Sequence, residues 1–389
     1  MYQVKTFNAI AQKGLEEFDD EFQINCSDDP DAYLIRSVNL LKSDFPKKLK
    51  TIVRAGAGIN NIPIELVTKK GIAVFNTPGS NANAVKELIV ALMIDISRNI
   101  FEAHDYSMEN TKADVSQRTE KDKTKFNGKE LMGKKIAVIG LGNVGSLVAN
   151  AALNLGMKVI GYDPYLSSDA AWRINNKVKR VDTIYQALSE ADIVTVHVPK
   201  NQETTDLIST EEIKKMKKGV ILFNYSRMGI VDNYSVVKAV DEKKISHYCT
   251  DFGEPLISNR KEVTITPHIG GSTIEAESKG AIQGADTIIN YLKSGDTIHC
   301  ANLPNIQIPF ETARRITIIH QNIPNMVGQF STKIANLNIN IENMSNAAKN
   351  LVAYTIIDVA AFNATKQKKL LESINAINGV YKVRIIKHQ

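Results

Sequence analysis

The chain has 389 residues, of which 43% are hydrophobic and 23% are charged, and its net charge is +6. This length exceeds one ordinary hydrophobic core, so we expect two or three domains, and the composition is that of a globular protein. No run of about 18 apolar residues and no signal-peptide pattern occurs, so we expect a cytoplasmic protein with no membrane partner. The lysine runs lack interleaved aromatic residues, which predicts solvated helix faces and no nucleic-acid partner. The three cysteines, Cys26, Cys249 and Cys300, are odd in number and lack metal-ligand spacing, which predicts neither a disulfide framework nor a metal site.

Residues 1–93 alternate strand candidates with helical stretches and are expected to form a small α/β domain. The strand candidates are residues 1–7, 33–36, 51–54 and 72–76. In the loop RAGAGINN, residues 54–61, Gly56 and Gly58 beside Arg54 can present backbone N–H groups and a guanidinium to an anion. A plain strand-to-helix turn with Arg54 at the surface is an equally good interpretation.

Two very different segments follow. Residues 83–108 have the apolar pattern of one long helix, either buried between domains or placed at a subunit interface. Residues 109–129 are polar and weakly periodic, which predicts a mobile surface loop.

The segment KIAVIGLGNVGSLVANAALNLGMKVIGYD, residues 135–163, has the order of a dinucleotide-binding βαβ unit. Its GxGxxG glycines, which provide a tight turn, room for a pyrophosphate and close helix packing, are Gly140, Gly142 and Gly145. The N–H groups around Asn143 and Val144 would face the phosphates at the positive end of the helix. Asp163 can accept both ribose hydroxyls and repels a 2′-phosphate, so we expect NAD rather than NADP unless a neighbouring Lys or Arg changes this.

Further strand candidates at 193–198, 220–224, 245–250 and 263–266 alternate with helical stretches, which indicates a parallel sheet. Ligands bind beyond the carboxyl ends of such strands. Four polar residues fall at or just after those ends: His197, Arg227, Asp251 and His268. Because the glycine turn lies at the same edge, we expect the four residues to belong to one site.

This site suits hydride transfer. An imidazole such as His268 can take a hydroxyl proton as hydride leaves, and Arg227 can hold a carboxylate in a forked pair. Glu254 is the nearest carboxylate in sequence that could orient His268. A single histidine or arginine is more often structural than catalytic, and it is the placement at the cofactor edge that favours the catalytic role.

The last part of the chain is expected to be a separate module. Residues 273–292 have a helical period, residues 300–311 form a linker, and residues 314–386 follow the order strand, helix, strand, strand, helix, strand. That order is the split βαβ, ferredoxin-like pattern.

With these motifs together, the chain resembles the D-2-hydroxyacid dehydrogenase family over nearly its whole length, and within it the members that oxidise phosphoglycerate and carry a C-terminal ACT domain. The resemblance implies two doubly wound, Rossmann-like α/β domains and a ferredoxin-like βαββαβ ACT domain. The expected boundaries are 1–93 with 272–300 for substrate, 94–271 for NAD and 314–389 for ACT. The implied reaction is NAD-dependent oxidation of 3-phospho-D-glycerate to 3-phosphohydroxypyruvate, the first step of L-serine synthesis.

The resemblance also assigns residues. Arg227 and His268 would be catalytic. The residues that would contact substrate are Arg54, Ala55, Gly56, Ala57, Gly58 and Asn81. Besides the glycine turn, those expected at the NAD site are Tyr162, Asp163, His197, Val198, Pro199, Ser226, Asp251 and Gly270. The chain departs from the family at Leu256, where a catalytic Glu is usual, so either Glu254 takes that role from a remodelled loop or His268 works unassisted.

In the C-terminal module, IIHQNIPNMVG resembles an effector loop that binds L-serine, which implies His320, Asn322 and Asn340 as effector-binding residues. ACT domains pair across subunits, so we expect a homodimer or homotetramer. A module that only stabilises the oligomer is the alternative. For the whole chain, two other functions stay open: oxidation or reduction of another acid such as 2-hydroxyglutarate, and a non-enzymatic NAD-responsive binding protein.

Overall fold

The computed structural model describes residues 1–388 and contains two compact units. One unit combines residues 1–81 with the chain from residue 274 onward, and the other comprises residues 82–273. The first boundary thus lies at 81/82 and not at the expected 93/94, because Val85, Ile89 and Met93 pack into the core of the second unit. The second boundary lies at 273/274, two residues beyond the expected one, and the C-terminal module groups with the N-terminal strands.

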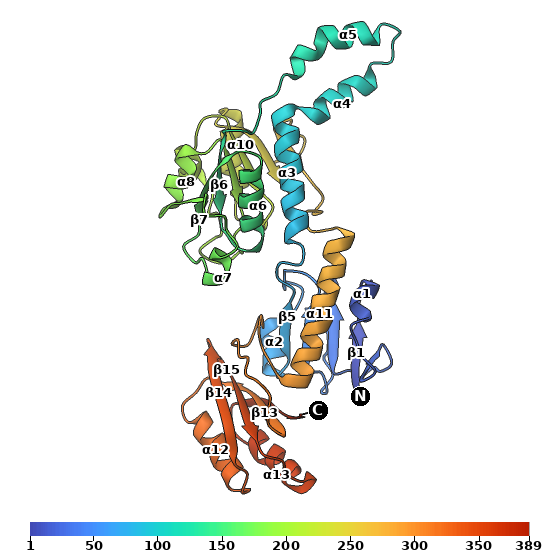
Figure 1. Ribbon diagram of the computed structural model, residues 1–389, viewed down its shortest axis with the longest axis vertical. Coiled ribbons are helices and arrows are strands. Elements are labelled where there is room, and N and C mark those ends of the chain that lie inside the picture. The colour runs from blue at the N-terminus through green and yellow to red at the C-terminus, as the bar shows by residue number, and fades with distance from the viewer. Residues whose placement is uncertain (389) are drawn as a thin grey trace. The chain divides into compact units, whose positions relative to one another are not determined.

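The first unit begins with a five-stranded parallel sheet in the order β2-β1-β3-β4-β5, a doubly wound arrangement. Its strands are β1 (Tyr2–Thr6), β2 (Phe22–Ile24), β3 (Ala32–Ile35), β4 (Thr51–Arg54) and β5 (Ala73–Asn76). The helices beside this sheet are α1 (Gln12–Leu15), α2 (Ile64–Lys69) and the long α11 (Ile274–Ser294) (Figure 1). Helix α11 follows the whole of the second unit in sequence.

The second unit is built on a seven-stranded parallel sheet in the order β12-β11-β10-β9-β6-β7-β8. Its strands are β6 (Lys135–Ile139), β7 (Lys158–Tyr162), β8 (Lys179–Arg180), β9 (Ile193–Val196), β10 (Val220–Asn224), β11 (Ile245–Thr250) and β12 (Val263–Ile265). Its helices include α3 (Ala82–Arg98), α6 (Asn143–Asn154), α7 (Ser168–Ala171), α8 (Ile184–Glu190), α9 (Thr210–Lys215) and α10 (Asn233–Asp241). The strand order reverses at β6, which pairs with β7 on one side and β9 on the other, and such switch points are where doubly wound sheets bind dinucleotides.

Two expectations for the segment after α3 are wrong. The long helix is interrupted at Asn99, which adopts a left-handed conformation with φ of 54°, so α4 (Ile100–Glu109) is a separate helix. The expected loop 109–129 contains α5 (Val115–Asp122) and the 3₁₀ helix η1 (Lys123–Phe126). Within this unit, α4 and α5 extend away from the sheet (Figure 1), and neither helix has a buried residue.

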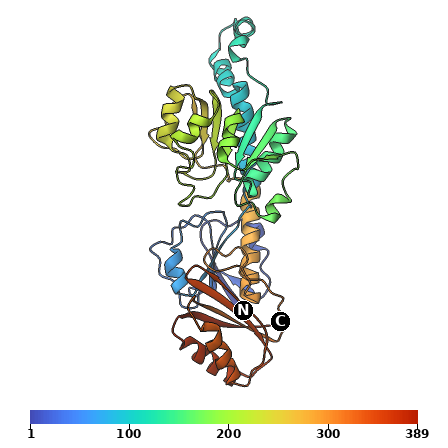
Figure 2. The same ribbon diagram turned by 90° about the vertical axis from the view of Figure 1, so that its left-hand side faces the viewer.

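The C-terminal module has the predicted order of elements. They are β13 (Arg314–Gln321), α12 (Met326–Ala335), β14 (Ile341–Lys349), β15 (Val352–Val359), α13 (Ala364–Asn375) and β16 (Val380–Lys387). The antiparallel sheet runs β14-β15-β13-β16, and both helices share one core on one of its faces, as Figure 2 shows. These findings confirm the predicted fold class of two doubly wound domains plus a ferredoxin-like βαββαβ module.

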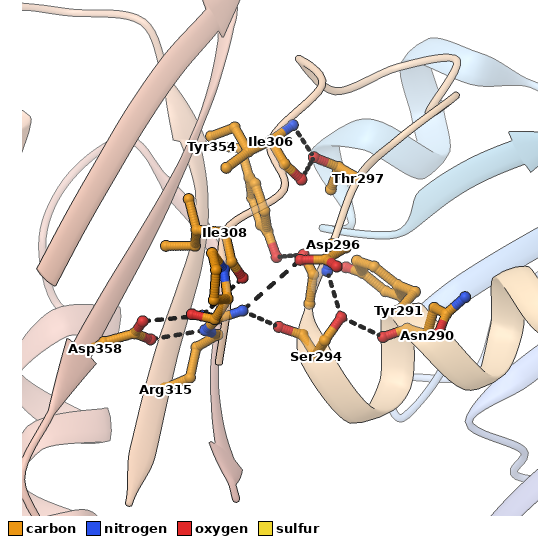
Figure 3. Close-up of polar contacts among 12 residues, drawn as sticks. Asn290, Tyr291, Ser294, Asp296, Thr297, Ile306, Ile308, Arg315, Tyr354 and Asp358 are labelled. Carbon is orange, nitrogen blue, oxygen red and sulfur yellow. Dashed lines mark hydrogen bonds and ion pairs between the residues drawn. The ribbon is translucent and has the colours of Figure 1, made fainter. Parts of the chain in front are cut away.

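The other face of this sheet is fixed to the end of α11 (Figure 3). Arg315 is fully buried and makes a forked pair with Asp358, with N–O distances of 2.7 and 2.9 Å. It also donates to the carbonyl of Ser294 at 3.0 Å, and the Tyr354 hydroxyl donates to the carbonyl of Gly295 at 2.7 Å. These bonds satisfy carbonyl groups at the end of α11 that have no partner within the helix.

None of the helices within residues 1–388 is long and apolar enough to cross a lipid bilayer.

Candidate active site

The turn between β6 and α6 has the geometry of a phosphate-binding loop. Gly140 has φ of +87°, and a Cβ there would lie 2.6 Å from the carbonyl oxygen of His197. A Cβ on Gly145 would lie 1.9 Å from the carbonyl oxygen of Gly140, so helix and turn could not approach this closely with any other residue. By contrast, nothing lies within 4 Å of a Cβ on Gly142, the residue directly before α6. The turn therefore leaves open space in front of the helix N-terminus, where a pyrophosphate would be attracted.

Asp163 directly follows β7 beside this turn. Its carboxylate accepts the backbone N–H groups of Leu141 at 2.8 Å and of Tyr165 at 2.9 Å. A carboxylate has about four lone-pair sites, so Asp163 can still accept ribose hydroxyls. Asp163 therefore has both the position and the spare acceptor capacity expected of a ribose ligand.

Arg173 is a cation near the turn that the sequence analysis did not single out. Its guanidinium donates to the side-chain oxygen of Asn143, the first residue of α6, at 2.9 Å. It lies 28 positions beyond the last glycine of the motif, and only the fold brings it to the turn. A neighbouring arginine of this kind can attract the 2′-phosphate of NADP and so weaken the preference for NAD that Asp163 creates.

His197, after β9, and Ser226, after β10, lie at the same edge of the sheet and form hydrogen bonds with uncharged groups. The ring of His197 shares a hydrogen bond with the Thr195 hydroxyl at 2.9 Å, and burial lowers the pKa of His197 to about 3. His197 is therefore neutral at physiological pH and is not a proton carrier. The Ser226 hydroxyl donates to the carbonyl of Val196 at 2.7 Å, which ties the loop after β10 to the end of β9.

Asp251, directly after β11, is buried and holds the loop that carries His268. One carboxylate oxygen accepts the N–H of Ile269 at 3.0 Å and also bonds the Thr266 hydroxyl, while the other accepts the N–H of Gly270 at 2.8 Å. A Cβ on Gly270 would lie only 2.9 Å from this second oxygen. Both carboxylate oxygens of Asp251 thus accept hydrogen bonds from residues 266–270.

His268 is exposed at the tip of that segment and has a left-handed backbone with φ of 56°. Its N–H donates to the carbonyl of Thr266 at 2.9 Å, and its ring makes a T-shaped contact with the ring of Phe252, with the centroids 5.2 Å apart. Among residues 1–388, no carboxylate forms an ion pair with the imidazole.

Within residues 1–388, Glu254 forms no hydrogen bond or ion pair with His268. The Glu254 carboxylate accepts a hydrogen bond from the side-chain amide of Asn233, the first residue of α10, at 2.9 Å. Arg227 lies in the exposed loop after β10, where its guanidinium donates to the carbonyl of Ser226 at 2.7 Å. His268 and Arg227 therefore share the carboxyl edge of the sheet, whereas Glu254 is engaged elsewhere.

In the other unit, the expected anion loop follows β4. The Gly56 N–H donates to the Thr77 hydroxyl at 2.7 Å, and a Cβ on Gly56 would lie 3.6 Å from the guanidinium carbon of Arg54. The Arg54 Nε donates to the carbonyl of Arg36 at 2.8 Å. Asn81 is a half-buried turn residue at the end of this stretch.

Arg36 is a second cation at this edge that the sequence analysis missed. It directly follows β3, the neighbour of β4, and Ile35 is in register with Arg54. Like His197 and His268, Arg36 falls at or just after the carboxyl end of a predicted strand, and this position is the sequence signal that marks it.

The three residues expected to bind an effector are in different surroundings. His320 is buried, its two ring nitrogens bond the carbonyl of Gln321 and the Thr355 hydroxyl, each at 2.8 Å, and burial lowers its pKa. The Asn322 amide donates to the carbonyl of Asn350 at 3.1 Å, and Asn340 is exposed just before β14. Effector binding at His320 would have to break or share its present hydrogen bonds.

Residues 90–270 match the family described as D-isomer specific 2-hydroxyacid dehydrogenase, NAD binding domain. The whole chain belongs to this dehydrogenase family, since it aligns over most of the length of a curated member: it is 30% identical to the D-3-phosphoglycerate dehydrogenase of Escherichia coli strain K12, covering 92% of this chain and 87% of the relative. NAD is accordingly the cofactor of the second unit.

Two further curated relatives are archaeal proteins named D-3-phosphoglycerate dehydrogenase. The one from Archaeoglobus fulgidus is 37% identical over 71% of this chain, and the one from Methanocaldococcus jannaschii is 36% identical over 72%. The chain spans about half the length of these two archaeal proteins, 52% and 53%.

Solved structures agree on the fold. An NAD⁺-bound 3-phosphoglycerate dehydrogenase of Entamoeba histolytica superposes with a TM-score of 0.61 at 26% identity, covering 77% of this chain and 98% of the other. The D-mandelate dehydrogenase of Rhodotorula graminis reaches a TM-score of 0.65 at 20% identity over 79% of this chain and 99% of the other.

Proposed function

We propose that the chain oxidises 3-phospho-D-glycerate to 3-phosphohydroxypyruvate with NAD, the first step of L-serine synthesis. The observation that carries the proposal is the shared edge: His268 and Arg227 follow the carboxyl ends of β12 and β10 in the sheet whose switch point carries the glycine turn. The relatives named D-3-phosphoglycerate dehydrogenase support the choice of substrate.

The proposed roles follow from the chemistry of the side chains. When bound, NAD accepts the hydride from the carbon that bears the substrate hydroxyl. His268 takes the proton of that hydroxyl and works without a carboxylate partner, and Arg227 holds the substrate carboxylate and polarises the developing carbonyl. Gly140, Gly142 and Gly145 seat the pyrophosphate.

In the first unit, we propose that Arg54, the backbone of residues 55–58, Asn81 and Arg36 hold the phosphate end of the substrate. Two guanidinium groups at neighbouring strand ends suit a dianionic phosphate better than an uncharged group. We accordingly assign residues 1–81 to substrate binding, residues 82–273 to NAD and the module from residue 314 to regulation as an ACT domain.

A substitution at Arg54 distinguishes a phosphorylated substrate from other 2-hydroxy acids. If Arg54 binds phosphate, Arg54→Ala raises the KM for 3-phospho-D-glycerate far more than the KM for an unphosphorylated acid such as D-2-hydroxyglutarate. Equal effects on the two substrates would favour the alternative acid.

Three finer assignments complete the proposal. The ACT domain binds L-serine through His320, Asn322 and Asn340 and feeds back on activity, the protein is a homodimer or homotetramer, and it works in the cytoplasm, where its three free cysteines stay reduced. If activity and oligomer mass are both unchanged in millimolar L-serine, regulation by serine is excluded.

A further inference from the structure

Arg36 is not free to meet an anion. Its guanidinium forms an ion pair with the carboxylate of Glu277, with an N–O distance of 2.6 Å, and both side chains are about one-third exposed, 34% and 39%. The carbonyl of Arg36 meanwhile accepts the Nε of Arg54. The carboxylate of Glu277 therefore occupies the guanidinium of Arg36, and the backbone of the same residue is bonded by Arg54, the other arginine that we assign to the phosphate.

Glu277 is held in this position by the way α11 packs. One turn further along the helix, a Cβ on Gly280 would lie 3.7 Å from the backbone of Ala55 and 3.5 Å from the Ser80 hydroxyl. On the next turn, a Cβ on Gly284 would lie 2.8 Å from the side chain of Leu34. The start of α11 therefore lies directly beside Ala55 of the anion loop, and the closer approach at Gly284 is to Leu34 on β3. The ion pair of Glu277 forms one turn before this contact.

We propose that Glu277 is a built-in competitor for the anionic end of the substrate: its carboxylate occupies Arg36 in the empty protein, and a phosphate that binds beside Arg54 displaces it. This inference rests on the proposed function, because it assigns Arg36 and Arg54 to the phosphate. The competition weakens the binding of every anion at Arg36 and favours those that form two charged contacts at once.

A purely structural role for Glu277 makes the opposite prediction. If the ion pair serves only to orient Arg36, removing the carboxylate leaves Arg36 less ordered and weakens anion binding. If Glu277 competes, Glu277→Gln releases Arg36 and strengthens anion binding by about twofold to fivefold, the scale of a partly exposed ion pair.

The test is calorimetric titration of the NAD-saturated protein with inorganic phosphate, since bound NAD keeps the probe from the glycine turn. The variants are Glu277→Gln, Arg36→Met and the double variant. The matched control is Glu275→Gln, which removes the same charge from the same helical turn at an exposed residue without an ion pair in the described structure.

We expect Glu277→Gln to bind phosphate about twofold to fivefold more tightly, Glu275→Gln to behave as the wild type, and Glu277→Gln to have no effect when Arg36 is already Met. Weaker or unchanged phosphate binding in Glu277→Gln would overturn the inference, and so would an equal gain in Glu275→Gln. Because the probe is phosphate and the readout is heat, the result holds even if the protein fails to oxidise 3-phospho-D-glycerate, and that failure would count against the proposed function alone.

Discussion

The buried carboxylate of Asp251 accepts a hydrogen bond of 2.8 Å from the backbone N–H of Gly270, two residues beyond His268. A second bond, from Ile269, reaches the other carboxylate oxygen. His268 is exposed and makes a T-shaped ring contact with Phe252, so we expect this anchor to fix where the imidazole lies. We infer that Asp251 positions His268 through the backbone of the histidine loop.

Asp251→Asn tests this anchor. The amide supplies one acceptor oxygen but turns an NH₂ group toward a backbone N–H, so the loop loses one of its two bonds. We expect kcat to fall about tenfold to a hundredfold, because small displacements of a catalytic group have this effect, while the far-ultraviolet circular dichroism stays that of the wild type. A kcat within twofold of the wild-type value would show that the loop does not need the anchor.

Glu254→Gln is expected to change turnover by less than about threefold. Glutamine can still accept the hydrogen bond of Asn233, and the carboxylate has no ion pair with His268 in the described structure. Steady-state kinetics beside His268→Ala, which should lose at least about a hundredfold, makes the comparison. A hundredfold loss in Glu254→Gln as well would restore this residue as the partner of the histidine.

Asp163→Ser is expected to weaken the preference for NAD over NADP by about tenfold or more, because the carboxylate that repels a 2′-phosphate is removed while Arg173 stays nearby. The ratio of kcat/KM for the two cofactors measures the effect. Adding Arg173→Met should reduce the gain with NADP. A ratio that does not change in Asp163→Ser would place the ribose away from this residue.

The lowered pKa of Lys382 makes the stability of the folded protein depend on pH. Burial, with repulsion from Arg384 and Lys50, lowers its pKa from 10.5 to about 8, while its ammonium donates to the carbonyl of Leu49. Between pH 8 and 10.5 the unfolded chain binds more protons at this residue than the folded protein does, so the free energy of unfolding increases as the pH rises. Below pH 8 the buried, charged ammonium lowers the free energy of unfolding, and this loss disappears as Lys382 is deprotonated.

The measurement is the free energy of unfolding of the wild type and of Lys382→Met between pH 7 and 10. The wild type should gain about 1–3 kcal/mol relative to the variant across this window. Parallel pH profiles for the two proteins would contradict the assigned shift.

Local patterns predicted most of the strands, the glycine turn and the C-terminal module because each depends on residues close in sequence, whereas the short strands β2 and β8 were not predicted. The break at Asn99 escaped detection because a single left-handed residue leaves the apolar pattern on both sides unchanged. Helix α5 was taken for a loop because none of its residues is buried, so it has no apolar period to find.

The site was harder to predict wherever it depends on tertiary contacts. Arg36 falls at the end of a predicted strand, but it lacks the neighbouring glycines that mark the anion loop at Arg54, and it was missed. Its closeness to Arg54 follows from the pairing of β3 with β4. The ion pair with Glu277 joins residues 241 positions apart, and no local pattern reveals it. The path of the chain after β11 likewise decides that Glu254 meets Asn233.

The central claim is tested most directly by mixing the protein with NAD and 3-phospho-D-glycerate and following the absorbance of NADH. We predict that NADH forms in a one-to-one ratio with 3-phosphohydroxypyruvate, and that His268→Ala and Arg227→Ala each form it at least about a hundredfold more slowly while still binding NAD. An absence of NADH with this and other 2-hydroxy acids, in a protein that calorimetry shows to bind NAD, would contradict the account and favour a cofactor-responsive binding protein.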